Sequence, residues 1–187
     1  MTELIDPRQL LISVAKILAR LKIPYLVTGG MAVFVWGRPR FTADVDIVIK
    51  LKLDDIDKLA ENLRALSEAS YIDKNSIKQA LMRHGEFNFI DGLTGIKVDF
   101  WAVGETQFNK SQLERRIAKN ILGQKVFFIS PEDLILSKLP WHKQSESSRH
   151  LEDIESVFKI QKKLDLGYLR KWAKLQSTIK ILESLIK

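Results

Sequence analysis

The sequence of 187 residues is long enough for one domain with its own hydrophobic core, or for a domain with a helical extension. Its hydrophobic share of 45% and charged share of 28% are typical of a globular protein, and it contains neither a secretory signal pattern nor an apolar run near the ~20 residues of a transmembrane helix. The absence of cysteine excludes disulfide bonds and thiolate metal sites, and it is consistent with a reducing, cytoplasmic location.

The net charge of +7 is concentrated at the C-terminal end of the chain. From Lys138 onward the sequence holds 11 Lys and Arg residues against 6 Asp and Glu residues. A basic segment of this kind fits a polyanionic partner such as a nucleic acid or the phosphates of a nucleotide. It also fits a lysine-rich helical surface that faces only water, and composition leaves both interpretations open.

Apolar spacing and capping residues divide the first half of the chain into alternating helices and strands. Asp6-Pro7 is a typical helix start, because aspartate caps free amides and proline is tolerated at the first helical position. Apolar residues at helical spacing follow as far as Ile23-Pro24. The further elements expected up to residue 82 are a strand over 25–28, a tight turn at Gly29-Gly30, a helix over 31–36, a strand over 44–50 and helices over 54–67 and 76–82.

The second half of the chain is expected to begin as sheet and to end as helix. A turn over 91–95 indicates a β-hairpin with strands over 86–90 and 96–103. The other expected elements are a helix over 111–119, a strand over 125–129, a helix that starts at Ser130-Pro131 and stops near Pro140, a polar loop over 141–148, and helices over 149–162, 166–175 and 177–186. We therefore expect an α/β (α+β) fold: a small mixed β-sheet flanked by helices in residues 1–138, and a C-terminal helical region in residues 139–187 packed on this core.

Two aspartates inside an apolar strand, Asp44 and Asp46, are the most informative residues of the chain. Strand residues two apart point to the same face, which brings their carboxylates within roughly 5–7 Å of each other. Like charges at this spacing repel unless water or cations neutralise them, and Mg²⁺ or Mn²⁺ prefers such oxygen ligands. Asp99 lies inside a later apolar strand and would complete a two-metal site. A lone D-x-D pair is more often a surface turn or a strand edge.

A glycine pair, Gly29-Gly30, separates a predicted strand from a predicted helix. Glycines at such a position let the backbone approach a phosphate closely, and the helix N-terminus adds amide donors and positive potential. Thr28 would add a hydroxyl group. The alternative is a simple tight turn. Because the glycines lie one helix before the two aspartates, the combination favours a site for a nucleoside triphosphate.

These residues resemble a known superfamily. The string Gly-Gly-x-Ala-x-x-x-x-Gly-x-x-Arg-x-Thr-x-Asp-x-Asp from Gly29 to Asp46, with Asp99 on a later strand, is similar to the DNA polymerase β-like nucleotidyltransferases. It resembles in particular the small nucleotidyltransferases that include the AbiEii-like toxins of toxin–antitoxin pairs. Pro131-Glu132-Asp133-Leu134-x-x-x-Lys138 and Leu151-Glu152-Asp153-Ile154 resemble the C-terminal helical part of that subset. The segment between Lys138 and Arg149 departs from it, because it is polar where relatives often have a continuous helix.

The resemblance implies a role for each matched residue. Asp44 and Asp46 would bind two metal ions, and Asp99 would join at the catalytic ion and help to deprotonate an attacking hydroxyl. The residues implied to bind the triphosphate are Thr28, Gly29, Gly30, Arg40 and Lys138. Arg40 has an alternative as the partner of an acidic neighbour, and Lys138 as an exposed helix lysine. The four tryptophans would stack on a base or pack in the core, and their apolar surroundings favour the core.

The sequence therefore predicts a metal-dependent nucleotidyltransferase that moves a nucleoside monophosphate from an NTP to a hydroxyl. The acceptor is RNA or tRNA, a protein or a small molecule, and the basic C-terminal third favours a polyanion. A cognate antitoxin is a further expected partner, and no membrane is expected. The alternative from another class is a non-catalytic module that binds a nucleotide or RNA and retains the fold. A third is a subunit whose activity needs a partner.

Overall fold

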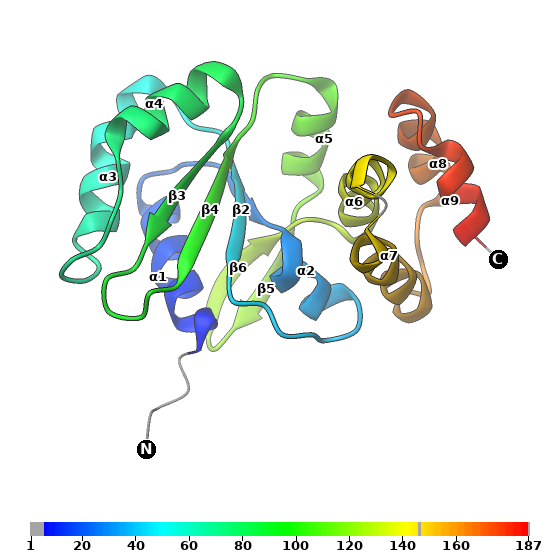
Figure 1. Ribbon diagram of the computed structural model, residues 1–187, viewed down its shortest axis with the longest axis horizontal. Coiled ribbons are helices and arrows are strands. Elements are labelled where there is room, and N and C mark those ends of the chain that lie inside the picture. Colours follow the sequence, from blue (N-terminus) through cyan, green and yellow to red (C-terminus); the bar gives the residue numbers. More distant parts are fainter. Residues whose placement is uncertain (1–5, 146, 187) are drawn as a thin grey trace.

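The chain folds around a six-stranded mixed β-sheet, shown in Figure 1. The computed structural model describes residues 6–145 and 147–186. The strands are β1 (Tyr25–Val27), β2 (Val45–Ile49), β3 (Glu86–Ile90), β4 (Lys97–Ala102), β5 (Ile117–Ile121) and β6 (Gln124–Phe128), in the spatial order β3-β4-β2-β1-β6-β5. Strand β2 runs parallel to β4, and β1 runs parallel to β6, whereas the other neighbours are antiparallel.

Helices cover the sheet and form the C-terminal third of the chain (Figure 1). They are α1 (Pro7–Arg20), α2 (Gly29–Trp36), α3 (Ile56–Arg64) after the short 3-10 helix η1 (Leu53–Asp55), α4 (Lys74–Arg83), α5 (Gln107–Arg115), α6 (Pro131–Ser145), α7 (Ser148–Ile160), α8 (Leu166–Leu175) and α9 (Ile179–Leu185). Within the described residues, none of these helices is both long and apolar enough to cross a membrane. The expected α/β class, with a mixed sheet followed by an all-helical C-terminal part, is confirmed.

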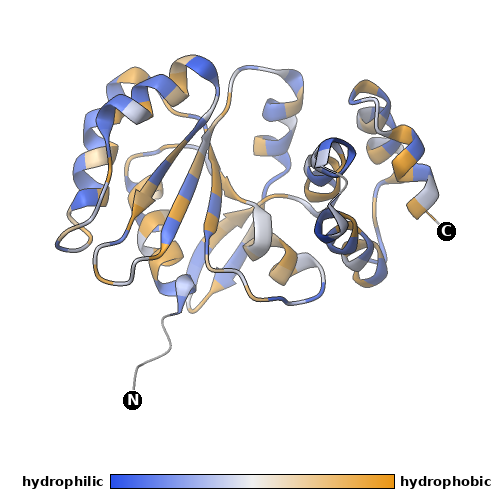
Figure 2. Ribbon diagram, viewed as in Figure 1, coloured by the Kyte–Doolittle hydropathy of each residue, from blue (hydrophilic) through white to orange (hydrophobic). Residues whose placement is uncertain are grey.

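The two faces of β2 and β4 have opposite character, because side chains alternate along a strand. Val45, Ile47 and Ile49 are fully buried on one face of β2, together with Val98 and Phe100 of β4. Figure 2 shows the resulting alternation of hydrophilic and hydrophobic residues along the strands. The opposite face carries Asp46 and Asp99 together with Val48 and Trp101, and Trp101 packs against Trp141 of α6.

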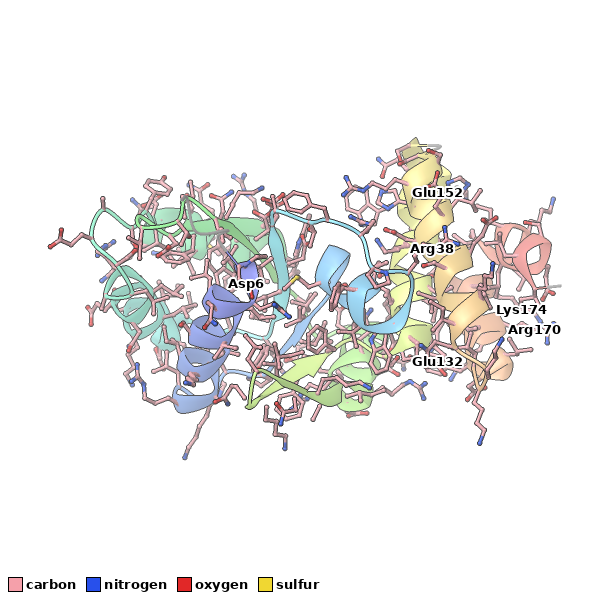
Figure 3. All side chains as sticks on the ribbon, turned by 90° about the horizontal axis from the view of Figure 1, so that it is seen from below. Asp6, Arg38, Glu132, Glu152, Arg170 and Lys174 are labelled. Carbon is pink, nitrogen blue, oxygen red and sulfur yellow. The ribbon has the colours of Figure 1, made fainter. Side chains whose placement is uncertain are left out.

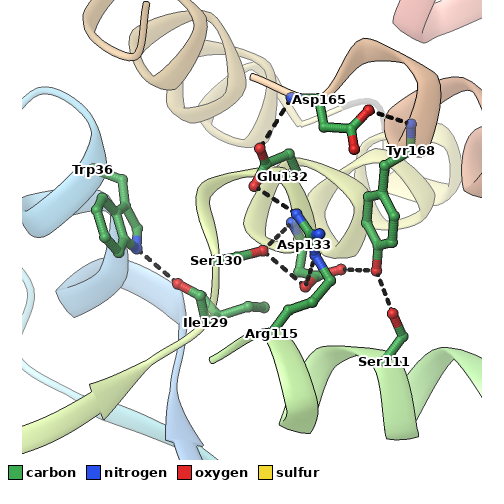
Figure 4. A network of polar contacts seen from close by, with 9 residues as sticks. All are labelled: Trp36, Ser111, Arg115, Ile129, Ser130, Glu132, Asp133, Asp165 and Tyr168. Atoms are coloured by element: carbon green, nitrogen blue, oxygen red, sulfur yellow. Dashed lines mark hydrogen bonds and ion pairs between the residues drawn. The ribbon is translucent and has the colours of Figure 1, made fainter. Parts of the chain in front are cut away.

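A buried polar network fixes the start of α6 (Figure 4). Asp133 has no solvent exposure, and it accepts hydrogen bonds from Ser130 Oγ at 2.8 Å and from Tyr168 Oη of α8 at 2.7 Å. Glu132 accepts from the amide of Asp165 at 3.0 Å and lies 3.2 Å from Arg115 of α5. The network therefore ties α5, α6 and α8 together. By contrast, Glu152 and Lys174 are exposed on the surface of α7 and α8 (Figure 3).

Two expectations about local structure are wrong. The helix expected over residues 111–119 ends at Arg115, and β5 begins at Ile117, where it pairs with β6 across a turn at Leu122-Gly123. The helix expected to stop near Pro140 instead continues to Ser145, so the first part of the expected polar loop is helical. Residue 146 of that loop lies outside the described residues. The proposed division at residue 138 falls inside α6, and it stays a prediction.

Candidate active site

The sheet register brings Asp46 and Asp99 side by side. The two residues are paired in the parallel strands β2 and β4, and Asp44 directly precedes β2. Because Val45 and Ile47 point into the core, Asp44 and Asp46 point to the opposite face, as the alternation predicted. All three predicted carboxylate residues therefore lie on, or directly before, the two neighbouring strands β2 and β4.

Asp46 is the carboxylate of this group whose surroundings disfavour its negative charge. Burial raises the pKa of Asp46, the negative charge of Asp99 raises it further, and the positive charge of Lys138 opposes both effects. Asp99 is buried; its Oδ2 lies 2.7 Å from Lys97 Nζ. The other oxygen, Oδ1, is also buried, and no described residue forms a hydrogen bond with it. A buried carboxylate oxygen without a donor is costly, and a bound cation would relieve that cost.

The carboxylates are suitable ligands for a divalent metal ion, but they do not form a complete metal site by themselves. Among residues 6–145 and 147–186, no three side chains of His, Cys, Asp or Glu converge closely enough to hold a metal ion. Mg²⁺ does not require such a cage, because it keeps several waters and is usually held by one or two carboxylates together with substrate phosphates. The orphaned Oδ1 of Asp99 and the like-charged neighbours of Asp46 are consistent with this mode of binding.

The glycine pair is packed directly against this group. Helix α2 begins at Gly29 itself, two residues earlier than expected, so both glycines belong to its first turn. Gly29 has a φ of +59°, and a Cβ atom at this position would overlap Oδ2 of Asp46. A Cβ atom on Gly30 would lie 2.6 Å from Oγ1 of Thr42. The glycines therefore serve a close approach, and they leave the N-terminus of α2 beside Asp46.

A cavity of about 620 Å³ opens beside these residues. This volume is within the range of roughly 300–1,000 Å³ that is usual for small-molecule sites. The predicted residues that line it are Thr28, Gly29, Gly30, Arg40, Asp44, Asp46 and Lys138. The structure thus brings together all but one of the predicted site residues in one cavity. The exception is Asp99, which does not line the cavity but is paired with Asp46 in the neighbouring strand.

The two predicted cationic residues share a partner that sequence reasoning did not assign to the site. Asp153 of α7 is buried and accepts two hydrogen bonds from Arg40, at 2.8 and 2.9 Å. Its Oδ2 also lies 2.9 Å from Nζ of the buried Lys138. Burial alone would raise the pKa of Asp153, but the hydrogen bond from Arg40 and the charge of Lys138 hold that pKa below its usual range. Of the two contacts considered for Arg40, the structure shows the one with an acidic neighbour.

The side of the cavity formed by the C-terminal helices adds further groups. Arg149 and His150, at the start of α7, line it one turn before Asp153. Burial lowers the pKa of His150, and the nearby charge of Lys138 lowers it further. Two of the four tryptophans, Trp101 and Trp141, also line the cavity, whereas Trp36 and Trp172 are buried elsewhere, as core packing predicts. No spacing rule would have identified Arg149 or His150, because only the fold brings α7 to the sheet.

Sequence comparison identifies the family of this chain. The model of the nucleotidyl transferase AbiEii toxin family, a type IV toxin–antitoxin system, matches residues 16–178. The chain belongs to this family. The matched range includes all eight predicted site residues and Asp153, and the expected resemblance to the DNA polymerase β-like nucleotidyltransferases is confirmed. Comparison with curated protein sequences gave no match.

Solved structures share the fold of this AbiEii family chain. The antibiotic-resistance factor ANT(2'')-Ia is similar with a TM-score of 0.61 and 15% sequence identity, over 96% of this chain and 97% of that one. An antigenic nucleotidyltransferase-like protein from Paracoccidioides brasiliensis gives a TM-score of 0.56 and 22% identity, over 95% and 90% of the two chains. The lincosamide antibiotic adenylyltransferase LnuA gives a TM-score of 0.56 and 15% identity, over 84% and 99%.

Proposed function

We propose that this protein is a metal-dependent nucleotidyltransferase that transfers a nucleoside monophosphate from an NTP to a hydroxyl group. The observation that carries the proposal is the pairing of Asp46 with Asp99 in adjacent parallel strands, with Gly29 packed against the carboxylate of Asp46. Both features belong to one face of the sheet, beside a cavity large enough for a nucleotide. Membership of the AbiEii family supports the reaction class and a role in a toxin–antitoxin system.

In this proposal Asp44, Asp46 and Asp99 hold Mg²⁺ or Mn²⁺. When bound, the metal supplies positive charge that neutralises the reacting phosphate and the leaving oxygen. The amides of Gly29 and Gly30 at the N-terminus of α2 hold the β- and γ-phosphates, aided by the hydroxyl of Thr28. The reaction forms a bond between the acceptor oxygen and the α-phosphorus and breaks the bond from that phosphorus to the β-phosphate. Pyrophosphate leaves, and the carboxylate of Asp99 takes the proton of the hydroxyl.

Lys138 is the proposed cationic partner of the triphosphate, and Asp153 positions it. The side chain of Lys138 is only 8% exposed, and its Nζ is fixed by Asp153 at 2.9 Å. A buried lysine held in place loses little entropy when it binds a phosphate. Arg40 is fixed by the same carboxylate, so phosphate binding and the position of α7 are linked through Asp153.

The acceptor that we propose is a polyanion such as RNA or tRNA, and a cognate antitoxin is the proposed protein partner. The support for a polyanion is the excess of Lys and Arg over Asp and Glu in the last third of the chain. A non-catalytic nucleotide-binding module is the second candidate. The ion pair between Lys97 and Asp99 favours it, because a lysine at that carboxylate competes with a metal ion.

The experiment that tests the function is incubation with each α-labelled NTP, Mg²⁺ and total RNA. We expect label to enter RNA with the natural protein and Asp54→Asn, an exposed aspartate outside the cavity, and to be lost with Asp46→Asn. Equal labelling by Asp46→Asn and the natural protein would contradict the assignment. NTP binding that is indifferent to Mg²⁺, without any transfer, would favour the non-catalytic module.

A further inference from the structure

One end of the cavity is aromatic. Trp101 comes from β4, two residues beyond Asp99 on the same face, and Trp141 comes from α6, close to one turn beyond Lys138. Their ring centroids are 6.2 Å apart, with the planes at 66°. Trp141 is 50% exposed, and Trp101 is half-buried. Indole rings are usually buried in the protein core. Two solvent-accessible indole rings in a cavity therefore indicate a surface for a flat apolar ligand.

A buried amide lines the same cavity. Gln112 of α5 is only 6% exposed, and its side chain forms no hydrogen bond with any described residue. Phe108 lies four residues earlier, and therefore on the same side of α5, and it also lines the cavity. Its ring centroid is 4.9 Å from that of Trp172. The amide atoms of Gln112 are not among the fully buried polar atoms that lack a partner, so they are accessible from the cavity. The open cavity beside Gln112 indicates a ligand with a donor and an acceptor.

We propose that Trp101, Trp141 and Gln112 form the subsite for the nucleobase of the donor NTP. The proposal rests on the proposed function, because it places the phosphates at the other end of the same cavity, at Gly29 and Gly30. A nucleobase has a flat π-face and an edge on which donors and acceptors lie side by side. The indole rings match the face, and the carboxamide of Gln112 matches the edge.

The order of groups along the strands agrees with a bound nucleotide. Trp101 follows Asp99 by two residues on β4, and Val48, which also lines the cavity, follows Asp46 by two residues on β2. Two strand residues advance about 6–7 Å, so the aromatic end begins one side-chain repeat beyond the carboxylates. Phosphates at the glycines, the α-phosphate at Asp46 and the base at the indoles therefore follow one another along the cavity.

The same geometry argues against the acceptor as the ligand of the aromatic end. The attacking hydroxyl has to reach Asp99, whose side chain is not part of the cavity wall, unlike that of Asp46. Asp99 is instead flanked by Lys97 on its own strand, and by Asn88, its partner on the edge strand β3. The acceptor therefore meets Asp99 outside the cavity wall, and the enclosed space is left to the donor nucleotide.

The carboxamide of Gln112 offers a donor and an acceptor, and rotation by 180° exchanges them. The carboxamide can therefore form hydrogen bonds with the polar edge of any base, and it does not select one particular base. This predicts that a triphosphate without a base, or with a base that lacks the edge groups, binds more weakly than a natural NTP.

Calorimetry in Mg²⁺ with each natural NTP and with ribose 5'-triphosphate tests the subsite. We expect Trp141→Ala and Gln112→Met to weaken binding of the best NTP by about 10-fold or more, as is usual for loss of base stacking or of a base-edge contact. Binding of ribose 5'-triphosphate should not change. Tyr71→Ala is the matched control, because Tyr71 is 54% exposed and lies outside the cavity, and it should bind all ligands like the natural protein.

The outcomes separate this inference from the proposed function. If the natural protein transfers nucleotides and both variants bind NTPs with unchanged affinity, the base subsite is wrong and the function stands. If the variants lose affinity only for the acceptor, the aromatic end belongs to the acceptor and the inference is also overturned. If the natural protein neither binds an NTP nor labels RNA, the proposed function fails, and the subsite fails with it.

Discussion

At the scale of single residues, Gly29 is where the proposed phosphate site and metal site touch. It begins α2, it has a φ of +59°, and its Cα hydrogen faces the carboxylate of Asp46 on β2. A side chain here would meet two separate penalties. One is the left-handed backbone conformation, and the other is overlap with Oδ2 of Asp46.

Gly29→Ala and Gly95→Ala separate these penalties. Gly95 also has a positive φ, +69°, but a Cβ atom there meets no atom within 4 Å. We expect Gly95→Ala to lose about 1–2 kcal/mol of unfolding free energy from backbone strain, measured by urea denaturation, and Gly29→Ala to lose more, because its Cβ atom also overlaps Asp46. Only Gly29→Ala should also lose nucleotidyl transfer, because it displaces Asp46. Full activity of folded Gly29→Ala would show that Asp46 can move without consequence.

The strongest candidate site residues were predictable because their signal is local. Asp44, Asp46 and the glycine pair stand within 18 residues of one another, and alternation along a strand fixes which side chains share a face. Asp99 was predictable as an aspartate in an apolar strand, although its pairing with Asp46 required the sheet. Gln112 carries no local signal, and Asp153 stands out only through the family resemblance of Leu151-Glu152-Asp153-Ile154. Asp153 acts through partners more than 100 residues away or on another helix, and Gln112 is one polar residue of a short helix.

At the scale of elements, the expectations failed where tertiary contacts override local preference. Proline in a helix costs about 3 kcal/mol and removes one hydrogen bond, so Pro140 predicted an end. The helix continues because the fully buried Leu139 anchors it, and Lys143 Nζ donates to the carbonyl of Ser177 at 3.0 Å. Strand β5 was missed because it lies at the edge of the sheet with mostly exposed side chains, which blurs the alternation.

Asp153 connects three elements, so its loss should weaken their junction. Asp153→Asn removes the negative charge that Arg40 and Lys138 share, and we expect a loss of about 3 kcal/mol at pH 7. The pKa of Asp153 is lowered in the folded state, so its contribution is present above the unfolded pKa of about 4 and is lost as the pH falls through the folded value. The difference between variant and natural protein should therefore shrink near pH 3.

Urea denaturation at pH 7 and pH 3 measures this difference. Glu155→Gln is the control, because Glu155 is exposed on the same helix, and it should change the unfolding free energy by less than about 0.5 kcal/mol. An equal difference for Asp153→Asn at both pH values would show that its charge does not hold the junction.

Tyr168 tests the network at the start of α6. Its hydroxyl donates to Asp133, which is fully buried, and it also contacts Ser111 Oγ at 2.8 Å. Tyr168→Phe leaves a buried carboxylate with one donor fewer, so we expect a loss of about 1–3 kcal/mol. Thermal denaturation measures this loss. Tyr71→Phe, at an exposed tyrosine, is the control and should leave the stability unchanged. Equal stability of the two variants would mean that Asp133 does not depend on α8.

At the scale of the whole molecule, the proposed nucleotide site joins the sheet to the C-terminal helices. The glycines and Asp46 belong to the sheet side of the cavity, whereas Lys138, Arg149 and His150 come from α6 and α7. A nucleotide that contacts both sides should stabilise both, whatever the exact boundary near residue 138. The basic C-terminal third then contributes charge to the site as well as to the surface.

Thermal unfolding with an NTP and Mg²⁺ tests this coupling. A ligand at 100 times its Kd adds about 2.7 kcal/mol to the unfolding free energy, so we expect one cooperative transition that moves to higher temperature. The double variant Asp44→Asn/Asp46→Asn should show a much smaller shift, because its metal-assisted contact to the phosphates is lost. Two transitions, of which only one responds to the nucleotide, would instead show that residues 139–187 unfold independently and do not complete the site.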